Sequence, residues 1–229
     1  MLRGFLPSLI EGTGVTLSVA ICSLAIAIVL GMTGALMKLS ASSTLRAIAT
    51  VYTTVIRGVP DLVLMLLIFY GGQLVINEFT LRLGIEEVVD INPFIAGVVT
   101  IGFIFGAYLT ETFRGAILAI PSGQREAAIA YGMTNTQVFM RITLPQMVRF
   151  ALPGFSNNWL VLVKSTALVS VIGLSDMMQR AGMAAGTTRE PFTFYLAAGV
   201  LYLMITTVSL LLLRYMQKRY SLGTKVAVL

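Results

Sequence analysis

Four charged side chains in this sequence lie inside long apolar stretches, and they are its clearest candidates for chemistry. They are Asp61, Glu111, Arg114 and Lys164. A charge at the centre of a bilayer costs about 2.5–3.5 kcal/mol on insertion scales, so each of them needs a partner, water or a function. Asp61 directly follows a proline that interrupts its apolar run, and a carboxylate there could bind a cationic group of a substrate.

These charges, together with two neighbouring asparagines, define a candidate substrate path. Its members are Asp61, Glu111, Asn157, Asn158 and Lys164. A purely structural interpretation stays open beside it, because buried charges are generally paired. In that interpretation Glu111 pairs with Arg114 or Lys164, Asp61 pairs with Arg57, and the asparagines form hydrogen bonds between helices.

The composition argues against most other chemistries. The chain has no histidine and a single cysteine, Cys22, so we expect no metal site and no histidine-dependent nucleophile. It lacks the G-x-x-x-x-G-K-[ST] phosphate loop, and no glycine is followed directly by lysine. We therefore expect that the chain is not an enzyme, holds no cofactor of its own and does not hydrolyse ATP by that route.

The elements that must position these side chains are membrane-spanning helices. Of the 229 residues 57% are hydrophobic and 11% are charged, against about 25% charged in a typical soluble domain. The apolar runs predict an all-α polytopic protein with about five transmembrane helices in a single domain, residues 1–229. The expected spans are 12–37, 47–77, 93–118, 150–174 and 191–213. Pro60 should kink or break the second of them.

The charge distribution predicts the orientation in the membrane. The net charge is +6, but the basic residues lie at the ends of apolar runs, so we expect no nucleic-acid partner. One side would carry the basic residues and the other the acidic loop 78–92. By the positive-inside rule the N-terminus is outside and the C-terminus cytoplasmic, in a multi-pass protein surrounded by lipid. The basic side comprises Lys38, Arg46, Arg125, Arg141, Arg149 and the C-terminal tail.

One polar segment, residues 121–145, predicts a helical hairpin on the basic side. A short helix from Glu126 would stop at Gly132, which can adopt a left-handed conformation. Thr134 and Gln137 have the spacing of a capping box that starts a second helix, and Pro145 would close the segment. From spacing alone, an interfacial loop without a partner is an equally good interpretation.

The same segment resembles the EAA loop in the membrane permease subunits of bacterial ABC importers. The shared pattern is Glu-Ala-Ala, three residues, Gly, nine residues, and Ile-x-Leu-Pro. In that family the loop is a coupling helix that docks into a groove of a partner ATPase. The resemblance therefore implies an ATPase-coupling role for Glu126, Ala127, Ala128, Gly132, Ile142, Leu144 and Pro145.

Further motifs extend the resemblance to nearly the whole chain. They resemble the polar amino-acid permeases, in particular the Q-type permeases of the histidine/lysine/arginine/ornithine importers and of the octopine and nopaline importers. Many relatives that import neutral or acidic amino acids have an apolar residue where Asp61 stands, which favours a basic amino acid as the substrate. The motifs are Arg57-Gly58-Val59-Pro60, Gly106-Ala107-Tyr108, Glu111-x-x-Arg114-Gly115, Pro121-x-Gly123-Gln124, Lys164-Ser165-Thr166 and Arg219-Tyr220-Ser221-x-Gly223.

The resemblance implies a complex in the bacterial inner membrane. An external solute-binding protein would deliver the amino acid, and a pair of ABC ATPases would bind ATP and Mg²⁺. No internal repeat is visible, so the second half of the path would come from another permease, an M-type sister or a second copy of this chain. The alternative is an ion-coupled secondary transporter that uses Asp61 and Glu111 as proton relays.

Overall fold

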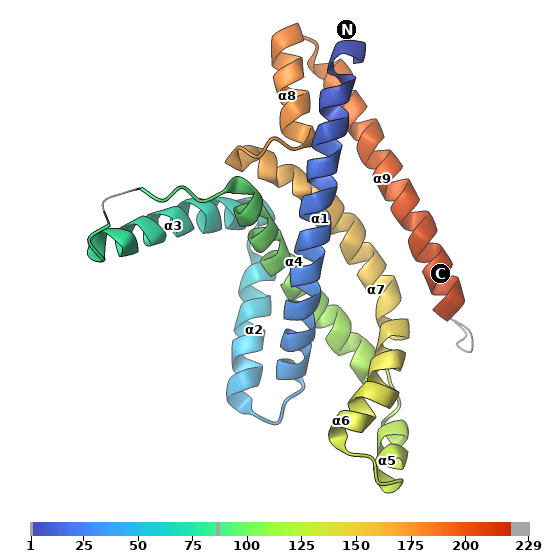
Figure 1. Cartoon of the computed structure of the whole chain (residues 1–229). Helices are drawn as coiled ribbons and strands as arrows, with labels where there is room; N and C mark the ends of the chain where they lie inside the picture. Colours follow the sequence, from blue (N-terminus) through green and yellow to red (C-terminus); the bar gives the residue numbers. More distant parts are fainter. Residues whose placement is uncertain (1, 86–87, 221–229) are drawn as a thin grey trace.

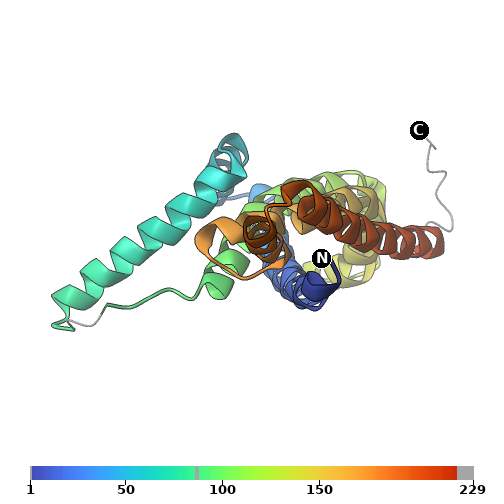
Figure 2. The ribbon, with the colours of Figure 1, turned by 90° about the horizontal axis from the view of Figure 1, so that it is seen from above.

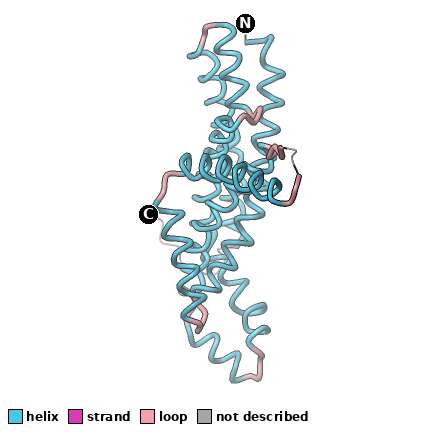
Figure 3. The backbone as a smooth tube through the Cα atoms, turned by 90° about the vertical axis from the view of Figure 1, so that its left-hand side faces the viewer, coloured by secondary structure: helices cyan, strands magenta, loops and turns pink. Residues whose placement is uncertain are grey.

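Five helices in the described part of the chain are long and apolar enough to cross a membrane. The computed structural model describes residues 2–85 and 88–220, and within them it contains helices and loops but no strand (Figure 1 and Figure 3). The expected all-α polytopic fold is confirmed. Parts of two sequence motifs, Glu86 and Glu87 of the acidic loop and the tail from Ser221, lie outside the described residues. The five spans are Gly4–Lys38, Asp61–Arg82, Pro93–Leu118, Asn135–Ile172 and Pro191–Arg219.

Helix α4 (Pro93–Leu118) is the centre of the bundle, and α1 (Leu2–Lys38) packs along it. Asn92 caps the start of α4 by accepting the Phe94 N–H at 2.8 Å. Glycines let the two helices approach closely. A Cβ atom added at Gly31 of α1 would lie 2.6 Å from Cβ of Leu109. One added at Gly102 of α4 would lie 2.7 Å from a side chain of α1.

The expected second span, 47–77, consists of two helices, and the break expected at Pro60 is confirmed. The chain forms α2 (Ser43–Gly58) and α3 (Asp61–Arg82), and Val59 between them is extended, with φ −108° and ψ 138°. A proline lacks the N–H that continues a helix and pushes the residue before it out of the helical conformation, so Pro60 produces a complete break. Only α3 is long enough to be a span. It extends away from the bundle, at a large angle to α1 (Figure 1 and Figure 2).

The fourth span starts earlier than the expected 150–174. The hairpin helices α5 (Ser122–Ala130) and α6 (Asn135–Val138) are followed by a π-helical turn, η1 (Phe139–Thr143), which runs directly into α7 (Leu144–Ser165). Pro145 does not close the hairpin, because it lies in the first turn of α7. The Leu144 N–H donates to the Phe139 carbonyl five residues earlier. Such local π geometry is one way in which a helix accommodates a proline.

The remaining helices build a second packed region at the N-terminal end. After the 3₁₀ helix η2 (Thr166–Ile172), α8 (Met177–Thr188) packs against α1 and α9 (Pro191–Tyr220). Helix α1 begins ten residues before the expected start at residue 12, because its first turns contact α8 and α9. Leu9 and Phe194 are buried there, and α9 continues seven residues past the expected end at residue 213.

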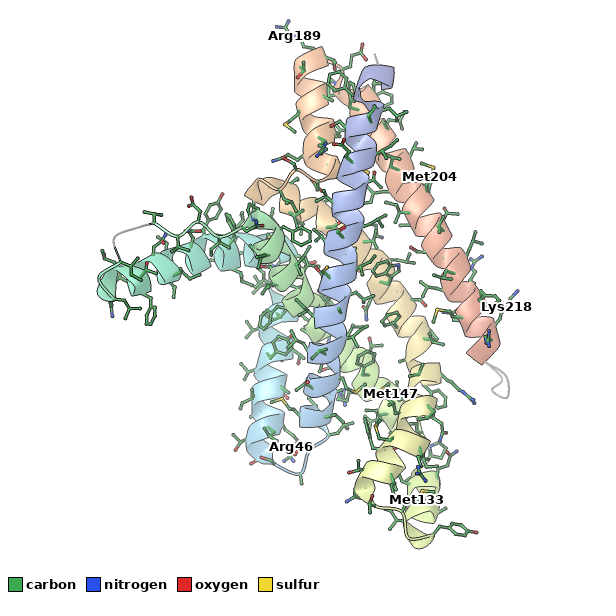
Figure 4. All side chains as sticks on the ribbon, viewed as in Figure 1. Arg46, Met133, Met147, Arg189, Met204 and Lys218 are labelled. Atoms are coloured by element: carbon green, nitrogen blue, oxygen red, sulfur yellow. The ribbon has the colours of Figure 1, made fainter. Side chains whose placement is uncertain are left out.

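The bundle is elongated, and its two ends are formed by different elements (Figure 1). Arg46 and Met133 lie at the end that carries the hairpin, which we call the hairpin end (Figure 4). Arg189 lies at the opposite end, beside the N-terminus, which we call the α8 end (Figure 1 and Figure 4).

Candidate functional site: the hairpin and the helix break

A tight reversal at Gly132 gives the hairpin (residues 121–145) its shape. Helix α5 ends in a Schellman motif, in which the Gly132 N–H donates to the Ile129 carbonyl at 2.8 Å and the Met133 N–H to Ala128 at 3.1 Å. Gly132 has φ +81°, a conformation that costs other residues roughly 1–2 kcal/mol. The glycine stop expected from the sequence is confirmed.

The second helix of the hairpin begins with the expected capping box. The Thr134 hydroxyl accepts the Gln137 N–H at 3.3 Å, and the Gln137 side chain accepts the Thr134 N–H at 2.9 Å. Two backbone donors that would otherwise be unsatisfied are thereby paired reciprocally. The hairpin is consequently a defined structure rather than a loose loop.

The two arms of the hairpin enclose a shallow groove of about 380 Å³. Four of the residues expected from the sequence line it: Ala127 and Ala128 on one arm, Ile142 and Pro145 on the other. Glu126 is exposed and forms no ion pair with any described residue, while Leu144 packs against the main core. Of the seven expected coupling residues, four therefore line the groove, Gly132 forms the turn, Leu144 packs in the core, and Glu126 is exposed.

Three further residues belong to this surface, and the sequence motif did not identify them. Tyr131 is 89% exposed at the tip of the hairpin and lines the groove together with Arg141 and Arg149. An aromatic residue directly before a turn glycine, in a polar segment, is a signal that would have singled out Tyr131. Exposed aromatic and arginine side chains are typical anchors of protein interfaces.

The second candidate region lies where α2 and α3 separate. The Asp61 side chain is half-buried and lies near the side chain of Ser165, at the end of α7. The Arg57 guanidinium carbon lies 5.5 Å from the ring centroid of Tyr108 on α4, within cation–π range. Tyr108 interacts electrostatically with both Asp61 and Arg57. The two charges form no ion pair with each other, contrary to the structural alternative considered from the sequence.

Polar side chains continue from this break along α4 and α7. The Asn158 amide donates to the Thr112 hydroxyl at 2.9 Å. Thr112 follows Tyr108 by one turn, and Asn158 precedes Ser165 by two turns, so each pair shares a helix face. Asn157 and Lys164 lie one position away, on an adjacent face, and both are exposed. The sequence candidates on α7 therefore belong to two different faces.

Glu111 is held by two basic side chains. Lys38, at the end of α1, binds one carboxylate oxygen, and Arg114 binds the other at 3.0 Å. Pairing with Arg114 is confirmed, pairing with Lys164 is wrong, and Lys38 was missed because it is distant in sequence. This arrangement favours the structural interpretation of Glu111 over a place in the substrate path.

A bundle of five spans with a helical hairpin between the third and fourth defines a polytopic membrane protein of a transport type. Residues 24–222 match the family described as binding-protein-dependent transport system inner membrane component, and the chain belongs to that family. It is thus a permease component, and its family implies a binding protein as a partner.

The relatives confirm the resemblance to the Q-type permeases. The chain is 52% identical over 227 residues to the histidine/lysine/arginine/ornithine transport system permease protein HisQ of Escherichia coli (strain K12), with 99% of each chain covered. It is 41% identical over 232 residues to the octopine transport system permease protein OccQ of Rhizobium radiobacter, covering 99% of this chain and 98% of the relative. Among solved structures, the crystal structure of an amino acid ABC transporter with histidines superposes with a TM-score of 0.80. It is 31% identical, and 95% of this chain and 96% of the other are covered.

Proposed function

We propose that this chain is a membrane permease subunit of an ATP-driven importer for basic amino acids. The observation that carries the proposal is Asp61, a half-buried carboxylate at a helix break that no basic side chain of the described residues neutralises through an ion pair. The relatives named for basic amino acids and octopine support a substrate with a cationic group.

The helix break can recognise both ends of such a substrate. The Asp61 carboxylate would pair with the cationic side chain, and the Arg57 guanidinium would pair with the α-carboxylate. Tyr108 lies beside both groups, so its ring would orient the aliphatic part of the substrate between them. Ser165 lies near the Asp61 side chain and would restrict its rotamers. Asn158 and Thr112 would continue the polar lining.

The hairpin would couple this permease to the ATPase. Small residues on the hairpin, namely Ala127, Ala128 and Gly132, have no long side chains, so another protein could approach the backbone closely. Tyr131 projects as an anchor, and Arg141 and Arg149 give the groove a positive charge that suits acidic residues of a partner. ATP would close the ATPase pair, and the continuous path from η1 into α7 would transmit that motion to Asn158 and Ser165.

A second permease would cover α3. This helix is apolar, yet it extends from the bundle, and several of its large apolar side chains are more than half exposed. A second subunit packed on α3 would complete the path from the other side, as an M-type sister or as another copy. The exposed side chains include Leu67, Leu74, Val75 and Phe79.

Charge supports an orientation for this permease. Arg46 lies at the hairpin end and Arg141 and Arg149 line the hairpin groove, so that end would be cytoplasmic, where ATP is available, and the α8 end would face outward (Figure 4). The N-terminus would then be outside and the C-terminus in the cytoplasm of a bacterial inner membrane.

Uptake of amino acids into proteoliposomes that contain the purified complex tests the proposal against its alternative. The complex is purified from its native membrane through a tag on this chain, its subunits are identified, and it is placed in proteoliposomes with its binding protein. We expect an ATPase to co-purify and arginine uptake to require ATP. Uptake driven by a proton gradient in vesicles without ATP would favour the secondary transporter instead.

A further inference from the structure

A fully buried carboxylate lies outside both regions described above, at the junction between η2 and α8. The Asp176 side chain is 0% exposed. Its Oδ1 atom caps α8 by accepting the Gln179 N–H at 2.9 Å. Its Oδ2 atom is buried and has no hydrogen-bond partner among the residues that the structure describes. A buried negative charge without a partner is costly, so this carboxylate requires neutralisation.

Its basic neighbour does not supply that neutralisation. Arg180, one turn along α8, instead binds Glu11 of α1 at 2.8 Å and the Ser8 hydroxyl at 3.1 Å. Its Nε donates to the Ser175 carbonyl at 3.1 Å. The arginine is thereby directed toward the start of α1, and no ion pair joins it to Asp176 within the described residues.

A tyrosine of α9 has its hydroxyl group buried near the same junction. Tyr202 of α9 interacts electrostatically with Asp176, and its hydroxyl lies near Thr16 of α1 and Thr166 of η2. That hydroxyl forms no hydrogen bond of normal geometry with any described residue. The Thr16 hydroxyl accepts the Met177 N–H at 3.2 Å and donates to the Gly12 carbonyl at 3.0 Å, so it has no proton left to donate to Asp176. Asp176 Oδ2 and the Tyr202 hydroxyl therefore both lie in the junction without a hydrogen bond to each other.

The ionisable groups around the junction can be assigned element by element. Helix α1 contributes Glu11, α8 contributes Arg180, α9 contributes Tyr202, and η2 contributes none, with the exposed Lys164 two residues before it.

Burial raises the pKa of the Asp176 carboxyl to about 6, although backbone N–H donors oppose the rise. Because the folded state raises this pKa, proton binding stabilises the packing below pH 6, and that contribution is lost as the pH rises through 6.

We propose that Asp176 is a proton-binding site that stabilises the packing of α8 at the α8 end of the bundle. With a proton on Oδ2, the carboxyl group is neutral and can remain in the apolar junction without a basic partner. When the proton leaves to water, a bare carboxylate remains in the apolar junction, and α8 loosens from its neighbours. The outward end of the permease would then respond to pH independently of the hairpin and of substrate.

Spin-label distances on the full chain in lipid nanodiscs test this proposal. Labels are placed at Gly186→Cys on α8 and Gly14→Cys on α1, after Cys22→Ser removes the native cysteine. An added Cβ meets nothing within 4 Å at either glycine. We expect one narrow distance distribution at low pH and a broader one at high pH, with a midpoint near pH 6. A distribution that does not change between about pH 5 and pH 8 would overturn the proposal.

Two variants and one salt control assign the midpoint. Asp176→Asn keeps an acceptor for the helix cap and carries no charge, so we expect the narrow distribution at every pH. Glu11→Gln, the matched control, should leave the midpoint in place. A midpoint that follows sodium concentration at constant ionic strength would mean that a metal cation neutralises the site, and would overturn the proton assignment.

Discussion

The hairpin and the helix break are built in opposite ways. The hairpin is a local structure, in which each turn and cap is made by residues a few positions apart. The helix break is assembled from α2, α3, α4 and α7, with Arg57 and Ser165 more than a hundred residues apart. A local surface suits docking to another protein, because it keeps its shape while the bundle moves. A site shared by several helices suits a substrate path, because any relative motion of those helices changes the site.

A substitution at the tip of the hairpin tests whether this local surface docks to the ATPase. We expect Gly132→Asp to reduce ATP-driven uptake to background, because it adds bulk and negative charge where the ATPase would approach. The bundle should remain folded, since Gly132 is exposed and the strain at φ +81° costs only about 1–2 kcal/mol. Uptake and ATPase activity of the reconstituted complex, with thermal unfolding of the purified chain, measure the two effects separately.

The matched control is Gly123→Asp, which adds the same charge at an exposed hairpin position where an added Cβ meets nothing. It should retain most of the uptake. Equal loss in both variants would mean that charge on the hairpin, and not the docking tip, limits transport.

At the helix break we expect an effect that depends on the substrate. Asp61→Asn should reduce uptake of cationic amino acids about tenfold or more, corresponding to at least about 1.4 kcal/mol of lost interaction, and should affect neutral amino acids much less. Competition uptake with arginine and glutamine in the same vesicles measures the ratio. Glu78→Gln, on the exposed part of the same helix, is the control and should leave the ratio unchanged. An equal fall for both substrates would remove Asp61 from the substrate site.

The contrast also explains what the sequence could predict. The capping box, the glycine stop and the proline break depend on neighbouring residues, so Thr134, Gly132 and Pro60 identified them directly. Arg114 is three residues from Glu111, so this ion pair could also be predicted from the sequence. The ion pair between Lys38 and Glu111 could not be predicted, because it depends on how α1 packs along α4 through glycines.

Two features of the structure were not predicted, and both depend on tertiary packing. The sequence predicted a kink or break at Pro60 within the span 47–77, but not the direction of α3, and it grouped Asn157, Asn158 and Lys164, which lie on two faces of α7. A break can be read from a proline, but the direction that α3 takes afterwards depends on tertiary packing. Asn157 and Asn158 are adjacent in sequence and therefore lie on neighbouring faces of α7. The packing of α7 on α4 decides that Asn158 contacts Thr112 while Asn157 is exposed.

Glu111 should behave as a structural residue, unlike Asp61. Its side chain and that of Lys38 are 21% and 13% exposed, so we expect Glu111→Gln to destabilise the fold by about 1–3 kcal/mol, between the values typical of exposed and fully buried pairs. In the matched pair Glu78–Arg82 the side chains are 63% and 75% exposed, and Glu78→Gln should cost less than about 1 kcal/mol. Thermal unfolding in mild detergent compares the two. A selective loss of cationic substrate in Glu111→Gln, without loss of stability, would return this residue to the substrate path.

The smallest expected difference separates the two asparagines of α7. Asn158→Ala removes the hydrogen bond to Thr112, which should cost about 0.6 kcal/mol, the average for such bonds between membrane helices. Asn157 is exposed and its side chain forms no such hydrogen bond with any described residue, so Asn157→Ala should leave the unfolding midpoint unchanged. If Asn157→Ala instead lowers uptake while Asn158→Ala does not, the path follows the face shared by Asn157 and Lys164. The substrate would then pass between α7 and a second permease, and the helix break would be a gate rather than the binding site.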